Sequence, residues 1–332
     1  MSAAAAESWK FCIAPMMEWT DRHCRYFLRG LSKHSRLYTE MVTTGALLHG
    51  DAPRFLRFDP AEQPVALQLG GSEPDALSRC AEMGAAAGYA EINLNCGCPS
   101  DRVQEGRFGA CLMREPERVA AAVKAMRAAC GVPVTVKSRI GVDDSEDYVF
   151  LKQFVEPVAA AGCDTFVVHA RKAWLKGLSP RENREIPPLR YEQVWRLKQE
   201  FPNLTVVING GLRTLDEVAA QLAHVDGVML GREAYENPFL LADVDARFFG
   251  GAAGPTRAQA LEAMREYLAR EIQAGTPAQA VLRHVLGLFR GQPGGRAFRR
   301  VLSQNMHRPG ADIELIDQAL AAVREAPLAA AA

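Results

Sequence analysis

The sequence lacks the features that mark membrane, secreted and disordered proteins. Its 332 residues contain no apolar run near the roughly 20 residues that a membrane-spanning helix needs. The first residues, MSAAAAESWK, lack the basic and then apolar order of a signal peptide. With 48% hydrophobic and 23% charged residues, the composition is also unlike that of disordered or fibrous chains. We therefore expect a globular cytoplasmic protein without a membrane partner.

The cysteines show no spacing typical of disulfide-rich or metal-binding proteins. A chain of this length needs no disulfides to stabilise it. Cys96 and Cys98 are one residue apart, but no CxxC or paired-histidine motif accompanies them, which argues against a zinc site. We expect no bound metal and eight free thiols: Cys12, Cys24, Cys80, Cys96, Cys98, Cys111, Cys130 and Cys163.

The chain has no excess of either charge, because 39 Lys and Arg balance 39 Asp and Glu, yet two segments are strongly basic. Residues 281–310 hold six arginines and no acidic residue. Residues 171–190 hold six Lys or Arg against two Glu, a net charge of 6 − 2 = +4. Each segment alone is compatible with a surface that faces only water. Together they make a polyanion a plausible partner.

Short apolar runs alternate with helical patterns over the first 235 residues. Runs with little internal alternation, separated by helices, are typical of buried parallel strands. Eight such strands predict an α/β fold, a (β/α)8 or TIM barrel. The expected strands are 11–15, 37–40, 65–69, 90–94, 134–137, 165–169, 205–209 and 227–230. The expected helices between them are 73–87, 116–130, 148–161, 191–200 and 215–223.

The alternation stops near residue 250. The segment GGAAGPT at residues 250–256 predicts a linker, and Thr256 is placed to cap the helix that follows it. Further helical patterns lie at 278–289, 296–306 and 313–325, without a strand among them. We therefore expect a barrel domain over residues 1–250 and a small helical-bundle domain over residues 251–332.

Chemically versatile residues gather where the predicted strands end, which is where TIM barrels carry their active sites. Gly210, Gly211, Gly231 and Arg232 follow the last two strands, where barrels commonly bind phosphate. The strand ends carry Ala14, Pro15, Met16, Met17, Glu40, Gln68, Asn93, Asn95, Lys137, His169 and Asn209.

Gln68, Lys137 and His169 each have an ordinary alternative explanation. The glutamine could cap a loop, the lysine could extend to water and the histidine could belong to the core. Their joint position favours a planar, polar heterocycle that needs donors and a nearby positive charge. A reduced flavin is such a ligand.

Cys98 differs from the other cysteines because a Gly-Cys-Pro turn after the fourth strand holds it. A thiol stays protonated at neutral pH unless a cation lowers its pKa, and it can then donate a proton. No Ser/His/Asp-type arrangement surrounds this cysteine. The pattern favours a general acid over a hydrolytic nucleophile.

These residues lie in motifs that resemble the bacterial tRNA-dihydrouridine synthases, in particular the branch that modifies D-loop uridines. The motifs are APMMEWTDRHCR, EINLNCGCPSDRVQEGRFGACLM, VVHARKAWLKGLSPRENREIPPLRY and the NGG and LGR loops. The resemblance implies that FMN is bound by Pro15, Met16, Met17, Gln68, Lys137, His169, Asn209, Gly210, Gly211, Gly231 and Arg232. It implies tRNA contacts at Asn95, Arg181, Arg184 and Arg300, with Arg299 a neighbouring candidate. Cys96 departs from the small apolar residue expected in this motif, and we assign it no catalytic role.

The resemblance also implies the reaction. NADPH, or NADH as the alternative reductant, reduces FMN, whose N5 gives hydride to C6 of a tRNA uridine while Cys98 protonates C5. U20 and U20a of the D-loop are the expected targets, and the enzyme is expected to be a monomer. The target base must leave its stack to reach a barrel mouth. Two alternatives stay open: an FMN barrel acting on a free pyrimidine, and a tRNA-binding module whose barrel is only structural.

Overall fold

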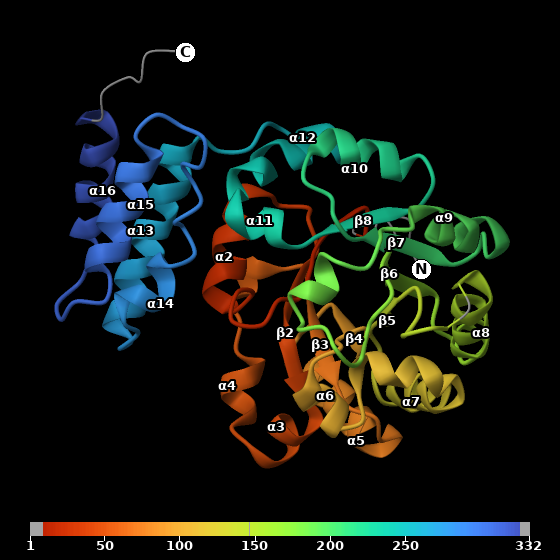
Figure 1. Ribbon diagram of the computed structural model, residues 1–332. Coiled ribbons are helices and arrows are strands. Elements are labelled where there is room, and N and C mark those ends of the chain that lie inside the picture. Colours follow the sequence, from red (N-terminus) through yellow and green to blue (C-terminus); the bar gives the residue numbers. More distant parts are fainter. Residues whose placement is uncertain (1–8, 146, 326–332) are drawn as a thin grey trace. The chain divides into compact units, whose positions relative to one another are not determined.

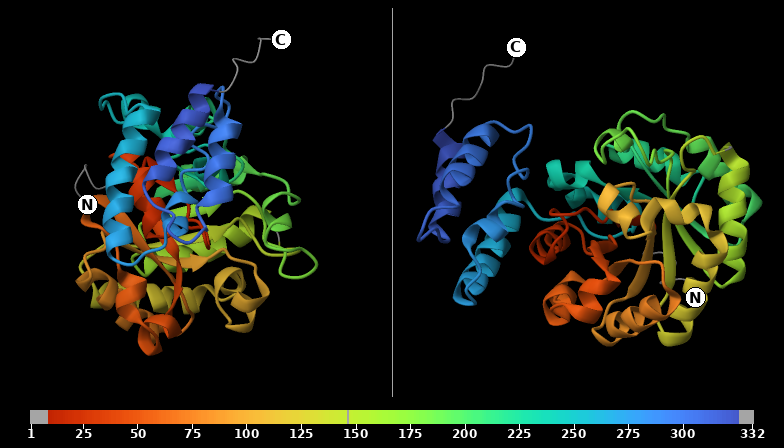
Figure 2. Two further views of the ribbon diagram at one scale, coloured as in Figure 1. Left: turned by 90° about the vertical axis from the view of Figure 1, so that its left-hand side faces the viewer. Right: turned by 60° about the horizontal axis from the view of Figure 1, so that its bottom comes forward.

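Eight parallel strands form one sheet that closes on itself in the computed structural model, which describes residues 9–145 and 147–325 (Figures 1 and 2). The strand order is β1-β8-β7-β6-β5-β4-β3-β2. The amide of Ile13 donates to the carbonyl of Arg36 at 2.8 Å, and the amide of Arg36 donates to Phe11 at 2.9 Å. This bridge joins the first and second strands, so the predicted TIM barrel is confirmed. The strands are β1 (Phe11–Ile13), β2 (Leu37–Thr43), β3 (Val65–Gly70), β4 (Glu91–Cys96), β5 (Val134–Arg139), β6 (Thr165–His169), β7 (Thr205–Asn209) and β8 (Gly227–Leu230).

The strand bounds agree with the prediction for β6, β7 and β8 and differ at several other ends. β2 continues to Thr43, so Glu40 lies inside this strand and not at its end. β4 and β5 each run two residues further than predicted, to Cys96 and Arg139. The prediction stopped at polar residues, but Asn95 and Arg139 are buried and hydrogen-bonded within the structure, which lets the strands continue through them.

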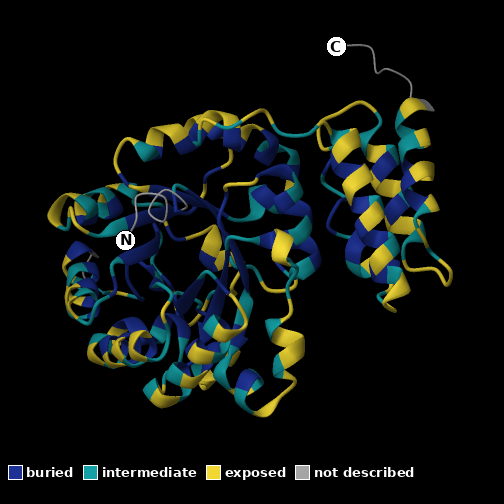
Figure 3. Cartoon of the chain, turned by 180° about the vertical axis from the view of Figure 1, so that it is seen from behind, coloured by how far each residue is buried: buried dark blue, intermediate teal, exposed yellow. Residues whose placement is uncertain are grey.

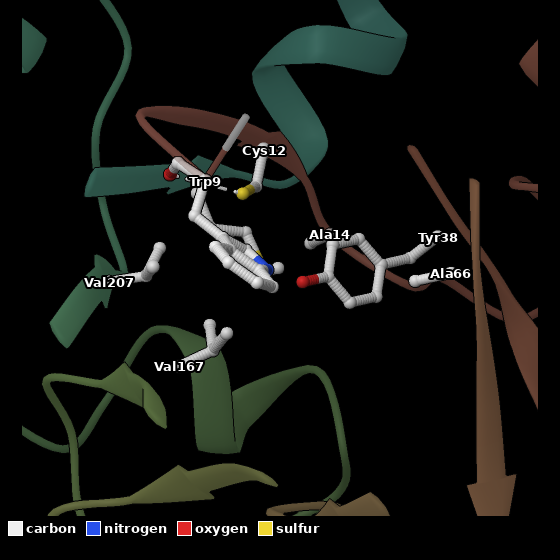
Figure 4. Close-up of a cluster of buried hydrophobic side chains, with 8 residues drawn as sticks. Trp9, Cys12, Ala14, Tyr38, Ala66, Val167 and Val207 are labelled. Atoms are coloured by element: carbon white, nitrogen blue, oxygen red, sulfur yellow. Dashed lines mark hydrogen bonds between the residues drawn. The ribbon is translucent and has the colours of Figure 1, made fainter. Parts of the chain in front are cut away.

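The barrel interior is filled by side chains that alternate along the strands. Trp9 lies at the centre of an apolar cluster that Figure 4 shows converging from several strands. The cluster contains Trp9, Cys12, Ala14, Tyr38, Ala66, Val167, Val207 and Met229. All eight side chains are nearly or completely buried, so the barrel is a packed core and not a channel.

Helices surround the strands and turn their exposed faces outward, as the burial colours of Figure 3 show. The five helices predicted between strands are confirmed to within one residue at each end. Pro116 occupies the first turn of its helix, where a missing N–H has no cost, and Thr214 and Glu217 form a capping box. These helices are α5 (Pro74–Ala86), α7 (Pro116–Ala129), α8 (Asp147–Ala160), α9 (Tyr191–Glu200) and α10 (Leu215–Leu222).

Several short helices were not predicted, and α2 is the longest of them. The Asp21 carboxylate accepts from the amides of His23 and Cys24 and so caps this helix. Arginines between its apolar positions hide the periodicity of RHCRYFLRGL. The helices of this group are α2 (Arg22–Leu31), α3 (Thr44–His49), α4 (Ala52–Leu56), α6 (Asp101–Glu105), α11 (Arg232–Glu236) and α12 (Val244–Phe248).

The C-terminal region is helical, as expected, and contains α13 (Arg257–Gln273), α14 (Ala278–Leu282), α15 (Gly295–Asn305) and α16 (Glu314–Glu325). Thr256 caps α13 with Gln259, which confirms the predicted cap. The helix expected over 278–289 ends already at Leu282 and continues as turns. Gly287 lies in these turns, close enough to Glu236 that a Cβ would come within 2.5 Å of its carbonyl oxygen.

Packing divides the chain into two compact units. The first comprises Met1–Glu18 and Ser35–Gly231, and the second comprises Trp19–His34 and Arg232–Ala332. In the second unit, Arg22 of α2 pairs with Glu271 of α13, with Nη1 at 2.7 Å from Oε1. Tyr26 stacks on Tyr267 with ring centroids 3.9 Å apart. The expected division at residue 250 rests on where the alternation of strands and helices stops, and it stays a prediction. No helix of the described ranges is both long and apolar enough to cross a membrane.

Candidate active site

Four predicted site residues meet at the carboxyl ends of neighbouring strands in the first compact unit. Asn95 is paired in register with Lys137, and His169 with Asn209. The Lys137 ammonium donates to Asn209 Oδ1 at 3.0 Å, and Asn209 Nδ2 donates to the carbonyl of Met229 at 2.7 Å. The barrel therefore brings together at its mouth the ammonium, imidazole and amide groups that lie on separate strands of the sequence.

The mouth of the barrel is electropositive. Burial, together with the charge of Arg139, lowers the pKa of Lys137 from 10.5 to about 7. Burial and the charges of Arg139 and Lys137 hold the pKa of His169 well below its usual value, so its imidazole is neutral at pH 7. Within the described residues, no carboxylate forms a hydrogen bond or ion pair with Lys137, Arg139 or His169, and the His169 ring has no hydrogen-bond partner.

The glycines after β7 and β8 differ in backbone conformation and in the space around them. Gly210 has φ 122°, and a Cβ there would lie 2.6 Å from Cδ2 of His169. Gly211 has φ 73°, which also favours glycine. Gly231 is the last residue of the first unit, and a Cβ added to it would make only ordinary contacts, with Ala14 Cβ at 3.8 Å and Met16 Sδ at 4.0 Å. Arg232 follows directly and begins α11 in the second unit.

These observations fit FMN. A phosphate and an electron-rich ring system need cations, backbone N–H groups at turns and polar side chains, and the mouth provides Lys137, the glycine turns and His169. Met16 packs against the apolar cluster, whereas 58% of Met17 is exposed. The donor set is thus suited to an anionic, planar ligand.

The loop that carries Cys98 is held on several sides. Gly97 and Cys98 both donate their amides to Asn95 Oδ1 at 3.0 Å. Ala110 donates its amide to the Cys98 carbonyl at 2.9 Å. Cys98 is half-buried, and its thiol donates to the Ser100 hydroxyl at 3.5 Å. Cys98 is therefore held on a backbone with little freedom and is not fully buried, which suits a positioned proton donor.

Cys96 has a different environment, although it is only two residues away. It is completely buried in β4, and burial raises the pKa of its thiol far above the usual value. Such a thiol neither ionises nor meets a ligand at neutral pH. All eight cysteines are free, as predicted.

Sequence reasoning missed Arg139 and Gln104, which shape this site, and it named Glu40 only as a strand-end residue without a role. Arg139 is buried and donates to the carbonyls of Gly97 at 3.1 Å and Asn183 at 2.9 Å, so it ties the Cys98 loop to the loop over residues 171–190. Gln104 donates to the carbonyls of Pro99 and Leu175 and adds a second tie. Glu40 accepts the amide of Glu18 at 2.5 Å and thereby holds the turn that follows Met17.

The predicted tRNA contacts lie in both units. Asn95 is almost buried, with 8% of it exposed. Arg181 and Arg184 are exposed on the loop over residues 171–190, where the Asn183 side chain donates to the carbonyls of Trp174 and Leu178. Arg299 and Arg300 are exposed on α15.

In the basic segment over residues 281–310, fewer arginines are available to an external partner than the sequence indicates. Arg283 pairs with Asp21 at 2.5 Å, and Arg290 lies 3.3 Å from Glu236. Four exposed arginines without an ion pair among the described residues are left: Arg296, Arg299, Arg300 and Arg308.

Comparison with known proteins identifies the family. Residues 12–324 match the model of the dihydrouridine synthase family. The chain is 55% identical to the tRNA-dihydrouridine(20/20a) synthase of Vibrio cholerae, over 95% of this chain and 97% of that protein. It is 56% identical to the protein of the same name from Escherichia coli K12, over 96% of this chain and 92% of that one.

A barrel closed by eight parallel strands, with a thiol and a cationic mouth at its carboxyl end, defines an enzyme-type TIM barrel. The chain belongs to the dihydrouridine synthase family. A solved 2-naphthoyl-CoA reductase complex is similar at a TM-score of 0.55 and 10% identity, covering 71% of this chain and 50% of that one, and supports the fold alone.

Proposed function

We propose that this protein reduces uridines 20 and 20a in the D-loop of tRNA to 5,6-dihydrouridine, with FMN as cofactor and NADPH as reductant. The observation that carries the proposal is the half-buried Cys98 thiol on a fixed loop beside a cationic barrel mouth. The family and the names of the relatives support the same reaction.

FMN would be held by residues of the barrel mouth and the loops after β7 and β8. Lys137 and His169 would bind the ring system, and the glycine turns, together with Arg232, would bind the phosphate. When bound, FMN supplies hydride chemistry for the C5–C6 double bond of uridine. The proposed ligands are Pro15, Met16, Met17, Gln68, Lys137, His169, Asn209, Gly210, Gly211, Gly231 and Arg232.

The side chains of this chain supply the proton and the position of the base. Cys98 holds the proton that is delivered to C5, and Asn95, beneath the same loop, contacts the uridine. In its ammonium form, Lys137 would supply a positive charge to the bound cofactor. Arg181, Arg184, Arg299 and Arg300 contact tRNA phosphates, which fix the position of the tRNA without reading its sequence.

The proposal is tested with an unmodified tRNA transcript, NADPH and the purified protein. Dihydrouridine should form at positions 20 and 20a, located by mass spectrometry of nuclease fragments, and the released chromophore should chromatograph as FMN. A transcript with cytidine at both positions is the matched control and should stay unmodified. Dihydrouridine at other positions, or none, would overturn the proposal.

A further inference from the structure

A continuous line of buried hydrogen bonds runs through the barrel interior and reaches the Cys98 loop. It begins at Glu91, the first residue of β4, and includes Asn93 and Asn95, which share one face of that strand because side chains alternate. Glu91, Asn93 and Thr135 are completely buried, and Gln68 and Asn95 are 1% and 8% exposed. Buried polar side chains on a strand interior are costly unless every one is paired.

Each link of the line has a short distance. Thr135 Oγ1 lies 2.5 Å from Glu91 Oε1, and Asn93 Nδ2 lies 2.7 Å from Thr135 Oγ1. Gln68 Nε2 lies 2.8 Å from Asn93 Oδ1, and Asn95 Nδ2 lies 2.9 Å from Gln68 Oε1. The line ends where Asn95 Oδ1 receives the amides of Gly97 and Cys98.

The groups at both ends of the line determine which atom donates and which accepts in each of its hydrogen bonds. At the upper end, the two backbone amides can only donate, so the Asn95 oxygen must face them. At the lower end, Glu91 receives Trp9 Nε1 at 2.8 Å and Arg36 Nη1 at 2.9 Å, and neither donor can accept. The Tyr38 hydroxyl also donates to the Glu91 carboxylate, at 2.9 Å from Oε1. A carboxylate paired with Arg36 accepts from Thr135, so the hydroxyl oxygen of Thr135 must accept from Asn93.

We propose that Glu91 is a positioning residue that, through Thr135, Asn93 and Gln68, fixes the orientation of the Asn95 amide and thereby the position of the Cys98 loop. The amide dipoles align head to tail toward the buried carboxylate, and hydrogen bonds in such a chain strengthen one another. One N–H each of Gln68 and Asn95 is used within the line, which leaves a second N–H on each side chain for a ligand carbonyl. Glu91 itself lies at the opposite end of β4 from the reacting atoms.

Thr135→Val tests the line at its middle, because valine keeps the shape and removes only the hydroxyl. Thr135→Ser is the matched control, since it retains the hydroxyl and loses the methyl group. In the purified flavin-loaded protein, amide hydrogen exchange of the peptide containing Gly97 and Cys98 should become about fivefold faster in the valine variant. The serine variant should resemble the wild type, and peptides of β6 and β7 should be unchanged in both.

The kinetic part of the test rests on the proposed function. With tRNA and NADPH, Thr135→Val should lower kcat by about ten- to a hundredfold while KM for tRNA stays within about twofold, because misplacement of a reacting group acts on the chemical step. Thr135→Ser should restore kcat. Glu91→Gln is a second variant. The new side-chain NH2 group needs an acceptor, and among the four groups bonded to Glu91 only the hydroxyls of Thr135 and Tyr38 can accept. This substitution therefore disrupts the line at its first hydrogen bond. Amide hydrogen exchange of the peptide containing Gly97 and Cys98 should be as fast in Glu91→Gln as in Thr135→Val.

Unchanged exchange and kcat in Thr135→Val, or equal losses in Thr135→Ser, would overturn the inference. Faster exchange across the whole barrel would also overturn it, since that result indicates a general loss of stability. A wild-type protein that fails to reduce uridine, while Thr135→Val still accelerates exchange only at the Cys98 loop, would reject the proposed function and retain the positioning role.

Discussion

At the residue scale, two thiols separated by one glycine have opposite surroundings. Cys96 is completely buried in β4, whereas Cys98 is half-buried on the loop beyond it. Cys98→Ala should retain FMN and tRNA binding but lose about 10² to 10⁴ in the rate of uridine reduction, because only the general acid is removed. Cys96→Ala should stay within a few-fold of the wild type. Single-turnover reduction of tRNA by pre-reduced protein measures the rate for both variants. If both variants lost the same fraction of this rate, neither thiol could be identified as the proton donor.

We expect the binding of FMN to depend on pH through Lys137. Burial and the charge of Arg139 lower its pKa to about 7 in the free protein. A bound anion favours the ammonium form, so above pH 7 binding must take up a proton, and FMN affinity should fall by up to about tenfold per pH unit from pH 7 to 9. Fluorescence titration of flavin-free protein measures this dependence. Lys137→Met, of similar size, should bind more weakly and with a flatter profile. The same slope in both proteins would assign the proton to another group.

At the scale of elements, the sequence was informative where apolar patterns repeat. Runs such as TFVVH and TVVIN have no polar interruption, and their strands were predicted to the residue. The candidate site could be located for a related reason, since parallel strands all end at the same mouth and their last residues must meet. Lys137, His169 and Asn209 do meet there.

The elements that sequence reasoning missed depend on contacts distant in the chain. Arg139 looks like a surface charge in VTVKSR, yet it is buried because three carbonyls from two other loops surround it. The polar line from Glu91 to Asn95 is equally hidden, since EINLN shows alternation but not that Thr135 and Gln68 on two other strands complete it. Helix α2 was missed because arginines interrupt its apolar face. Such partners are defined only by the closed barrel or by tertiary packing.

At the scale of the whole molecule, a neutral chain carries its positive charge on separate surfaces. In the first compact unit, Lys176, Arg181 and Arg184 are exposed on one loop. In the second, internal ion pairs engage Arg283 and Arg290, and exposed arginines remain on and after α15. Arg296, Arg299 and Arg300 are spaced by three and four residues, which places them on one face of that helix.

This helix face leads to a prediction about the salt dependence of tRNA binding. Each phosphate contact that an arginine makes releases counterions, so its loss reduces the slope of log affinity against log salt by about 0.7 to 0.9. Arg299→Ala combined with Arg300→Ala should therefore weaken tRNA binding and flatten the slope by up to about 1.4 to 1.8. NADPH oxidation without tRNA should stay near normal, because neither arginine is a proposed flavin ligand.

The matched control removes the same charge from a helix with no proposed tRNA contact. Arg54 and Arg57 are exposed at α4, so Arg54→Ala with Arg57→Ala changes the net charge by the same amount. If long-range attraction by net charge were the cause, both double variants would shift the slope equally. If phosphates are contacted directly, only the α15 variant shifts it. An unchanged slope in a folded α15 variant would mean that this surface faces only solvent, and that the loop with Arg181 and Arg184 binds the tRNA backbone instead.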